Sequence, residues 1–275
     1  AVRRKIKPSF NEEILYNFYM RLTKQFLYGT FYILIFVGIV WGIYSIKFKP
    51  APSCFDNRQN GQETGVDCGD SCISCEQKNL KPLSLSPALL FEGNRVFSAS
   101  AEIKNPNNNF SASSFDYVVN FYDKTGTILQ SIKNSSFIYP KETKPIIEAG
   151  VRITNGIPDK AEITIDEKTV VWEKPENFSR PDYKLKEVSA VIENEQVIIN
   201  GNLTNPTNSN ISKIVANAFL IDNSGKKIGA SKYEIKNMGR FETAFFKISI
   251  PINKALVNSV NLQATADNVF IEALK

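Results

Sequence analysis

The chain has 275 residues, with 33 lysines and arginines against 28 aspartates and glutamates, a net charge of +5, and it contains no histidine. Without histidine it lacks the commonest general base and the commonest zinc ligand, which argues against an enzyme. Residues 1–49 hold eight basic and two acidic residues, so the rest of the chain is nearly neutral. The basic excess therefore indicates membrane topology, and we expect no nucleic-acid partner.

An uncharged apolar stretch of 22 residues runs from Gln25 to Ile46. As a helix at 1.5 Å per residue it would extend about 33 Å, enough to cross the hydrocarbon core of a bilayer. We expect a cytoplasmic head over residues 1–24 and a transmembrane helix over 25–47, with the N-terminus inside because positive residues precede the span. No breaker separates the two, so one helix can run from about residue 10 to 46. A cleaved signal peptide is the alternative, although its apolar region would be shorter.

Two features of this helix suggest contacts with partners. Phe18, Tyr19 and Leu22 recur at helical spacing in the head. This apolar face either lies on the inner leaflet or binds a membrane or cytoplasmic protein. Gly38 and Gly42 form a GxxxG spacing, which lets two helix backbones pack closely, although glycine is also common in spans.

All four cysteines, Cys54, Cys68, Cys72 and Cys75, fall within 22 residues after the span. This concentration outside a membrane favours two disulfides in an oxidising compartment. We expect Cys72 and Cys75 each to bond to one of the two earlier cysteines, and the sequence does not choose between the resulting pairings. A zinc site is the alternative, but the spacing departs from paired C-x2-C knuckles. A redox role for the last two cysteines lacks a thioredoxin-like βαβ context.

Oxygen-bearing side chains and glycines separate the cysteines. Asp56, Asn60, Glu63 and Asp67 offer the ligands that calcium prefers. The same residue types also form ordinary turns by bonding to their own backbone, and the spacing is not that of an EF-hand. We therefore expect no cofactor, with calcium as the alternative.

The cysteine segment carries a recurring pattern, C-x-D followed by N-G-x-E-T-x-x-D-C-G and C-x-x-C. The matching residues are Cys54, Asp56, Asn60, Gly61, Glu63, Thr64, Asp67, Cys68, Gly69, Cys72 and Cys75. In this pattern the segment resembles a small cysteine module of prokaryotic cell-surface proteins, with Asp70 where the module usually has a second glycine. The resemblance implies a surface location for residues 48–80 and no particular activity.

The chain beyond residue 80 repeats itself at a spacing of about 100 residues. The recurring landmarks are Asn105-Pro106 and Asn205-Pro206, Asp123 to Gly126 and Asp222 to Gly225, and Glu142-Thr143 and Glu242-Thr243. Short β-branched and aromatic runs between turn residues predict that each copy is an immunoglobulin-like β-sandwich. The expected strands include Tyr117–Tyr122, Thr127–Ser131, Lys160–Ile165, Val170–Trp172, Gln196–Asn202, Val215–Ile221, Thr243–Ile250 and Val260–Ala266.

We expect the first sandwich over residues 81–173 and the second over 184–275. The linker, residues 174–183, contains Pro175 and Pro181, which predicts that the two sandwiches form a semi-rigid rod. The expected fold class is mainly β, with an N-terminal transmembrane helix, a small disulfide-rich module and two tandem immunoglobulin-like β-sandwiches.

The first copy contains Val-Asn-Phe-Tyr-Asp from Val119 to Asp123, followed by a glycine three residues later. This run resembles the FxLYD family of immunoglobulin-like domains, with Val119 in place of the phenylalanine and Phe121 in place of the leucine. The second copy keeps the leucine and the aspartate as Leu220 and Asp222. The resemblance implies an extracytoplasmic immunoglobulin-like fold and supplies no catalytic residues.

Three classes of function remain. The first is a non-catalytic, single-pass envelope protein that serves as a structural or accessory subunit of a membrane or surface assembly. The second is a cell-surface adhesin or ligand-binding receptor stalk. The third is a carboxylate-based enzyme, for which no pair of acids stands out. We favour the first class, with the membrane and other envelope proteins as partners, no small-molecule substrate, and C-terminal domains in the periplasm or at the cell surface.

Overall fold

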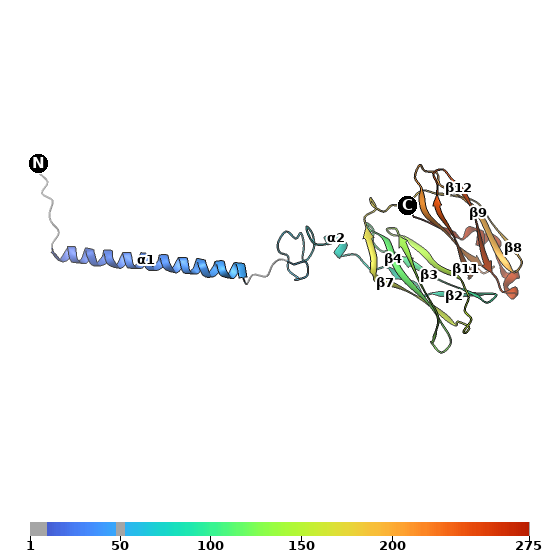
Figure 1. Ribbon diagram of the computed structural model, residues 1–275, viewed down its shortest axis with the longest axis horizontal. Helices are drawn as coiled ribbons and strands as arrows, with labels where there is room; N and C mark the ends of the chain where they lie inside the picture. Colours follow the sequence, from blue (N-terminus) through green and yellow to red (C-terminus); the bar gives the residue numbers. More distant parts are fainter. Residues whose placement is uncertain (1–9, 48–52, 275) are drawn as a thin grey trace. The chain divides into compact units, whose positions relative to one another are not determined.

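The computed structural model describes residues 10–47 and 53–274, and the chain divides into two compact units, residues 1–78 and 79–275 (Figure 1). The helices are α1 (Phe10–Lys47), α2 (Cys75–Lys78) and α3 (Leu262–Asp267), with the 3-10 helix η1 (Lys254–Ser259). The strands of the first copy are β1 (Ser84–Leu85), β2 (Leu89–Gly93), β3 (Val96–Lys104), β4 (Ser111–Tyr122), β5 (Ile128–Ile138), β6 (Thr143–Val151) and β7 (Lys160–Glu173). Those of the second copy are β8 (Lys184–Glu193), β9 (Gln196–Thr204), β10 (Ile211–Ile221), β11 (Lys227–Met238), β12 (Thr243–Pro251) and β13 (Val269–Leu274).

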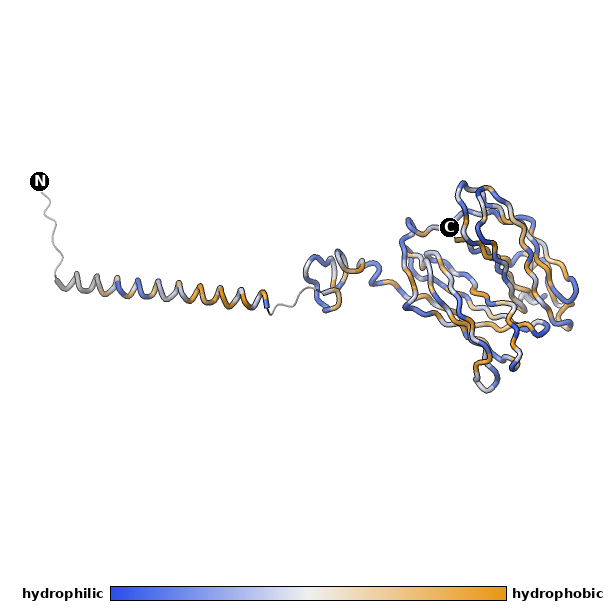
Figure 2. Tube along the Cα trace, in the orientation of Figure 1, coloured by the Kyte–Doolittle hydropathy of each residue, from blue (hydrophilic) through white to orange (hydrophobic). Residues whose placement is uncertain are grey.

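Helix α1 is one continuous helix of 38 residues, as the unbroken sequence predicts. Within the described residues it is the one helix long and apolar enough to cross a membrane, over Phe18–Lys47. Figure 2 shows the apolar residues concentrated in its second half. None of this segment is buried against the rest of the protein. Such an apolar surface is stable in lipid and unstable in water.

The second unit consists of four antiparallel sheets. In sheet 1, β3 pairs with both β1 and β2 along one edge and with β6 along the other. Sheet 2 has the order β5-β4-β7. Sheet 3 has the order β11-β10-β13, and sheet 4 has the order β12-β9-β8. Sheets 1 and 2 enclose one apolar core, and sheets 3 and 4 enclose another. The prediction of a mainly β chain with two tandem sandwiches is confirmed.

Three of the expected strands differ from the structure. Lys160–Ile165 and Val170–Trp172 belong to one strand, β7, whose register against β4 shifts between their two parts. Val260–Ala266 is not a strand, because most of it forms helix α3. The side chain of Asn261 caps this helix by accepting a hydrogen bond from the Ala264 amide, and such a cap stabilises a helix start over an extended chain.

The two sandwiches pack face to face, through sheets 1 and 3. Phe91 and Ile147 of the first sandwich form one buried cluster with Phe219, Ile221 and Ala230 of the second. As a result, β10 is buried on both faces, whereas β4, its counterpart in sheet 2, alternates between buried and half-buried positions. Sheets 1 and 3 are therefore the two inner layers of a four-layer body.

Two further features hold the sandwiches together. Gly93, at the end of β2, approaches Pro251 so closely that a Cβ there would lie 2.1 Å from the Pro251 carbonyl oxygen. In the linker, the Phe178 ring stacks on Tyr139 of the first sandwich at 5.2 Å between centroids. Arg180 lies over the same Tyr139 ring and forms an ion pair with Glu142.

These contacts show that the prediction of a semi-rigid rod, made from the linker prolines, is wrong. In a rod, the sheet faces that carry Phe91 and Phe219 would lie in water. Burying these two large side chains between the sandwiches lowers the free energy of the packed arrangement relative to the rod. The linker is short, and Phe178 and Arg180 fix it to the first sandwich.

We predict that Phe219→Ala in the second sandwich lowers the stability of the first as well, by about 3–5 kcal/mol in total, because it removes a fully buried ring from the shared cluster. The measurement is denaturant unfolding of the full chain followed by Trp172 fluorescence, in a Trp41→Phe background. Phe245→Ala is the matched control, because Phe245 is 59% exposed, and it should change stability by at most about 0.5 kcal/mol. An unchanged Trp172 transition in Phe219→Ala would mean that the sandwiches unfold independently.

Candidate functional site

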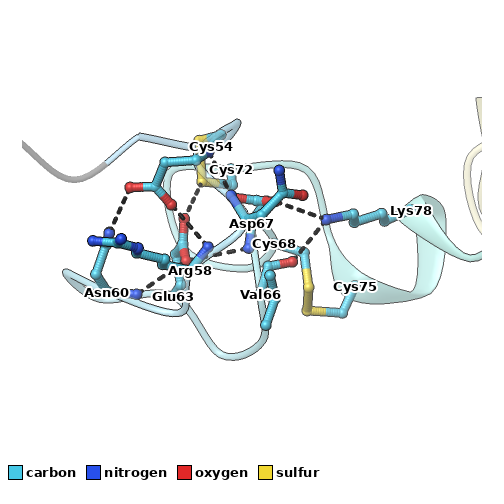
Figure 3. Close-up of a disulfide and its surroundings, with 12 residues drawn as sticks. Cys54, Arg58, Asn60, Glu63, Val66, Asp67, Cys68, Cys72, Cys75 and Lys78 are labelled. Carbon is cyan, nitrogen blue, oxygen red and sulfur yellow. Dashed lines mark hydrogen bonds and ion pairs between the residues drawn. A yellow bond between two sulfur atoms is a disulfide. The ribbon is translucent and has the colours of Figure 1, made fainter.

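The cysteine module is held by two disulfides, Cys54–Cys72 and Cys68–Cys75 (Figure 3). Each of the last two cysteines thus bonds to one of the first two, as expected. Cys54, Glu63 and Cys72 lie close together, but sulfur in a disulfide offers no thiolate to a metal. Because the disulfides use all four sulfur atoms, this structure favours the disulfide interpretation over zinc.

The four residues considered for calcium lie together in the module, and they bond mainly to its own backbone. Asp67 Oδ1 accepts hydrogen bonds from the amides of Asp56 and Asn57, each at 3.0 Å. Glu63 Oε2 accepts from the amides of Asn60 and Asp67, each at 3.2 Å. The Asn60 amide group donates to Asp56 at 2.7 Å and holds the pKa of that carboxyl below its usual range. These carboxylates therefore act as turn formers. Calcium binding, the alternative to the expected absence of a cofactor, is not tested by this structure.

Lys78 closes the module from its C-terminal side. Its ammonium group donates to the Val66 carbonyl at 2.8 Å and pairs with Asp67 at 3.3 Å (Figure 3). Phe55 and Ile73 remain exposed, Phe55 by 90%, beside a pocket of about 500 Å³ that both line. An exposed apolar pocket on a rigid module is a candidate contact for a partner.

The residues singled out in α1 contact little within the described protein. Phe18, Tyr19 and Leu22 are all exposed. A Cβ at Gly38 or Gly42 would meet no atom within 4 Å. These surfaces of the helix are thus open to lipid or to another protein, and residues 1–9 of the head lie outside the described residues.

The repeated Asn-Pro landmark is a buried clamp. The side-chain amide of Asn105 donates to the carbonyls of Phe110 and Tyr139, and its oxygen accepts from the Asn107 amide at 3.0 Å. In the second copy Asn205 makes the equivalent bonds to Ser209, Gly239 and Thr207. Each asparagine is fully buried and ties the turn before one strand to the turn before another. The Asn-rich loops are therefore structural corners.

The other two landmarks are also explained by local hydrogen bonds. Asp123 accepts from the amides of Thr125 and Thr127, and hydrogen bonding from the Thr125 hydroxyl lowers the pKa of its carboxyl. Asp222 does the same in the second copy, where the Ser224 hydroxyl lowers its pKa. Glu142 and Glu242 accept from the amides three residues before them, those of Tyr139 and Gly239. These repeated polar residues therefore hold turns.

A polar network that the sequence analysis missed lies between the sandwiches. Glu148 of β6, which is buried, accepts from the Tyr117 hydroxyl at 2.6 Å and pairs with Lys232 of β11 at 3.2 Å. Burial raises the pKa of Tyr117, and the Glu148 carboxylate adds to the effect, so the phenol remains a donor. Burial also raises the pKa of Tyr139, whose hydroxyl donates to the Ala273 carbonyl at 2.7 Å.

The same network contains a second group of buried polar residues. Lys144 of β6 forms an ion pair with Glu272 of β13, and Asn217 of β10 donates to the other oxygen of that carboxylate at 2.6 Å. Beside them lies a cavity of about 90 Å³ lined by both sandwiches. One signal was present in the sequence, since Asn217 is the one polar residue in the run from Ile214 to Ile221.

Comparison with known proteins adds little. No family model matches the chain, and no curated protein matches it. Among solved structures, the chain is similar to a transglutaminase of red sea bream, at 11% identity and a TM-score of 0.23, over 72% of this chain and 32% of that one. A TM-score this low carries no argument about fold or activity.

We predict that Asn105→Ala lowers the free energy of unfolding by about 2–4 kcal/mol, because it leaves two buried carbonyls and a buried amide without partners. Asn108→Ala is the control at the exposed tip of the same loop and should be nearly neutral. Denaturant unfolding of both variants measures the difference. Equal effects would contradict the clamp.

We predict that the longer-range disulfide stabilises the module more. Cys54 and Cys72 are 18 residues apart and Cys68 and Cys75 are 7 apart, so loop-closure entropy gives about 3 and about 2 kcal/mol. Each pair is replaced by serines, and hydrogen exchange is measured at the amides of Asp56 and Asn57. Faster exchange in the variant lacking Cys68–Cys75 than in the one lacking Cys54–Cys72 would reverse the prediction.

Proposed function

We propose that this chain is a non-catalytic, single-pass membrane protein of the cell envelope. Its outer domains contact other proteins as part of a membrane or surface assembly. The observation that carries the proposal is that the repeated polar residues of the sandwiches all hold turns. Three surfaces remain for recognition of partners. They are the apolar pocket of the cysteine module, the head, and the face of the span that carries Gly38 and Gly42.

The topology proposed is an N-terminus in the cytoplasm, α1 across the membrane, and the cysteine module and sandwiches outside. The positive residues before the span support this orientation. The two disulfides support an oxidising compartment for the part that follows. A cleaved signal peptide would separate α1 from the sandwiches, so the mass of the chain extracted from its native membrane distinguishes the two.

The proposed assembly contacts involve two faces of α1. The exposed aromatic face at Phe18, Tyr19 and Leu22 would bind a neighbouring protein at the cytoplasmic side. The Gly38 and Gly42 face would pack against another helix within the bilayer. The immunoglobulin-like fold and the resemblance to FxLYD domains and to a cell-surface cysteine module support an extracytoplasmic setting.

We predict that replacing Phe18, Tyr19 and Leu22 by serine, or Gly38 and Gly42 by leucine, releases partners from the purified complex. Bulky side chains at the glycines prevent close backbone approach, and serines remove the apolar contact. The measurement is purification from the native membrane in mild detergent, followed by size determination and mass spectrometry of the associated proteins.

Two controls match these variants. Gly29→Leu adds the same bulk nine residues from Gly38, which is two and a half helical turns and so on the opposite face. Met20→Gln makes the head more polar on its other side. Both controls should keep the complex intact. A complex of unchanged size in all variants would refute the assembly proposal, and a lone chain in the wild type would favour an adhesin or receptor stalk.

A further inference from the structure

The two sandwiches bring a primary amine, a carboxamide and a carboxylic acid together in their contact. Lys144 lies on β6 of the first sandwich, and Asn217 and Glu272 lie on β10 and β13 of the second. The Lys144 and Glu272 side chains are only 5% and 11% exposed, and Asn217 is 1% exposed. Three polar groups from two domains are thus removed from water at one point.

Glu272 bridges the other two groups. Its Oε2 contacts the Lys144 ammonium group, and its Oε1 accepts from the Asn217 amide at 2.6 Å. Because one carboxylate contacts both, the amine and the carboxamide are neighbours in the same buried group. The ion pair between Lys144 and Glu272 does not by itself explain why the Asn217 carboxamide lies at the same carboxylate.

The surroundings suit a reaction between amine and amide. The Phe137 ring lies 4.2 Å from the Lys144 nitrogen, and the Ser136 hydroxyl lies 3.1 Å from it. These contacts fix the amine in place, and holding two reacting groups in position lowers the barrier to a reaction between them. The cavity of about 90 Å³ beside Asn217 and Glu272 gives a small leaving group room to depart.

We propose that Lys144 and Asn217 form an intramolecular isopeptide bond that joins the two sandwiches covalently. Glu272 takes a proton from the Lys144 ammonium, and the free amine attacks the Asn217 Cγ. The bond from Cγ to the new nitrogen forms, and the bond from Cγ to Nδ2 breaks. Glu272 passes to Nδ2 the proton taken from the ammonium and then the proton that the attacking nitrogen loses as it becomes the amide N–H. Nδ2 therefore leaves as an ammonium ion, the carboxylate is regenerated and no other reactant is needed.

The bond would give the two packed sandwiches a mechanical and chemical stability that their non-covalent contacts lack. The sandwiches could not separate under force or in denaturant, which suits a subunit that transmits tension through an envelope. The inference does not depend on the membrane anchor or on any partner, so it stands or falls separately from the proposed function.

The test is intact-mass measurement of the reduced full chain. The wild type should be lighter than its sequence by one ammonia molecule. Tryptic digestion should yield residues 142–152 and 214–226 as one cross-linked species, joined through Lys144 and Asn217. A wild-type chain at its full sequence mass, with these two peptides separate, would overturn the proposal whatever the variants do.

Three variants assign the roles. Lys144→Arg keeps the positive charge without a nucleophilic amine, Asn217→Leu removes the carboxamide, and Glu272→Gln keeps the shape but cannot carry the proton. Each variant should have the full mass of its own sequence, with no ammonia lost. Glu148→Gln is the control, because Glu148 is a buried acid of the same contact that bonds to Tyr117 and Lys232 instead, and it should retain the loss of ammonia. A cross-link that persists in Glu272→Gln would refute the role of the carboxylate.

Discussion

The contact between sheets 1 and 3 is the feature on which the rest of the sandwich structure depends. It buries aromatic and aliphatic side chains from both copies in one cluster, so neither sandwich has its complete set of neighbours without the other. Hydrophobic burial supplies the free energy of this contact, and it has no directional preference. The charged and amide groups around it, Lys144, Glu148, Asn217 and Glu272, define the one relative position in which each finds a partner.

This contact changes how the repeat is understood. Two copies of one fold usually share their landmarks because the landmarks keep the fold, and here Asn105 and Asn205 clamp equivalent corners. The copies differ on the faces that meet. In the first copy the strand buried on both faces is β3, and in the second copy it is β10. The tandem is therefore asymmetric.

The first unit, residues 1–78, is stabilised in a different way. Helix α1 has no core of its own, and none of its apolar length is buried in the described protein. The cysteine module is too small to bury a sizeable core, so disulfides and carboxylate-to-amide bonds fix its turns. Rigid turns of this kind leave Phe55 and Ile73 on the surface.

The sequence by itself determined the elements whose cause is local. A 22-residue apolar run, four clustered cysteines and short β-branched and aromatic runs between turns have local causes, so helix α1, the presence of two disulfides and the two sandwiches were predictable. The choice between the possible cysteine pairings was not. Strand Val260–Ala266 was mispredicted because the cap at Asn261 outweighs the β-branched composition. The tertiary structure alone decided the face-to-face packing and the Lys144–Glu272–Asn217 group, because residues more than 50 positions apart meet there. No periodicity within a strand specifies which distant face will cover it.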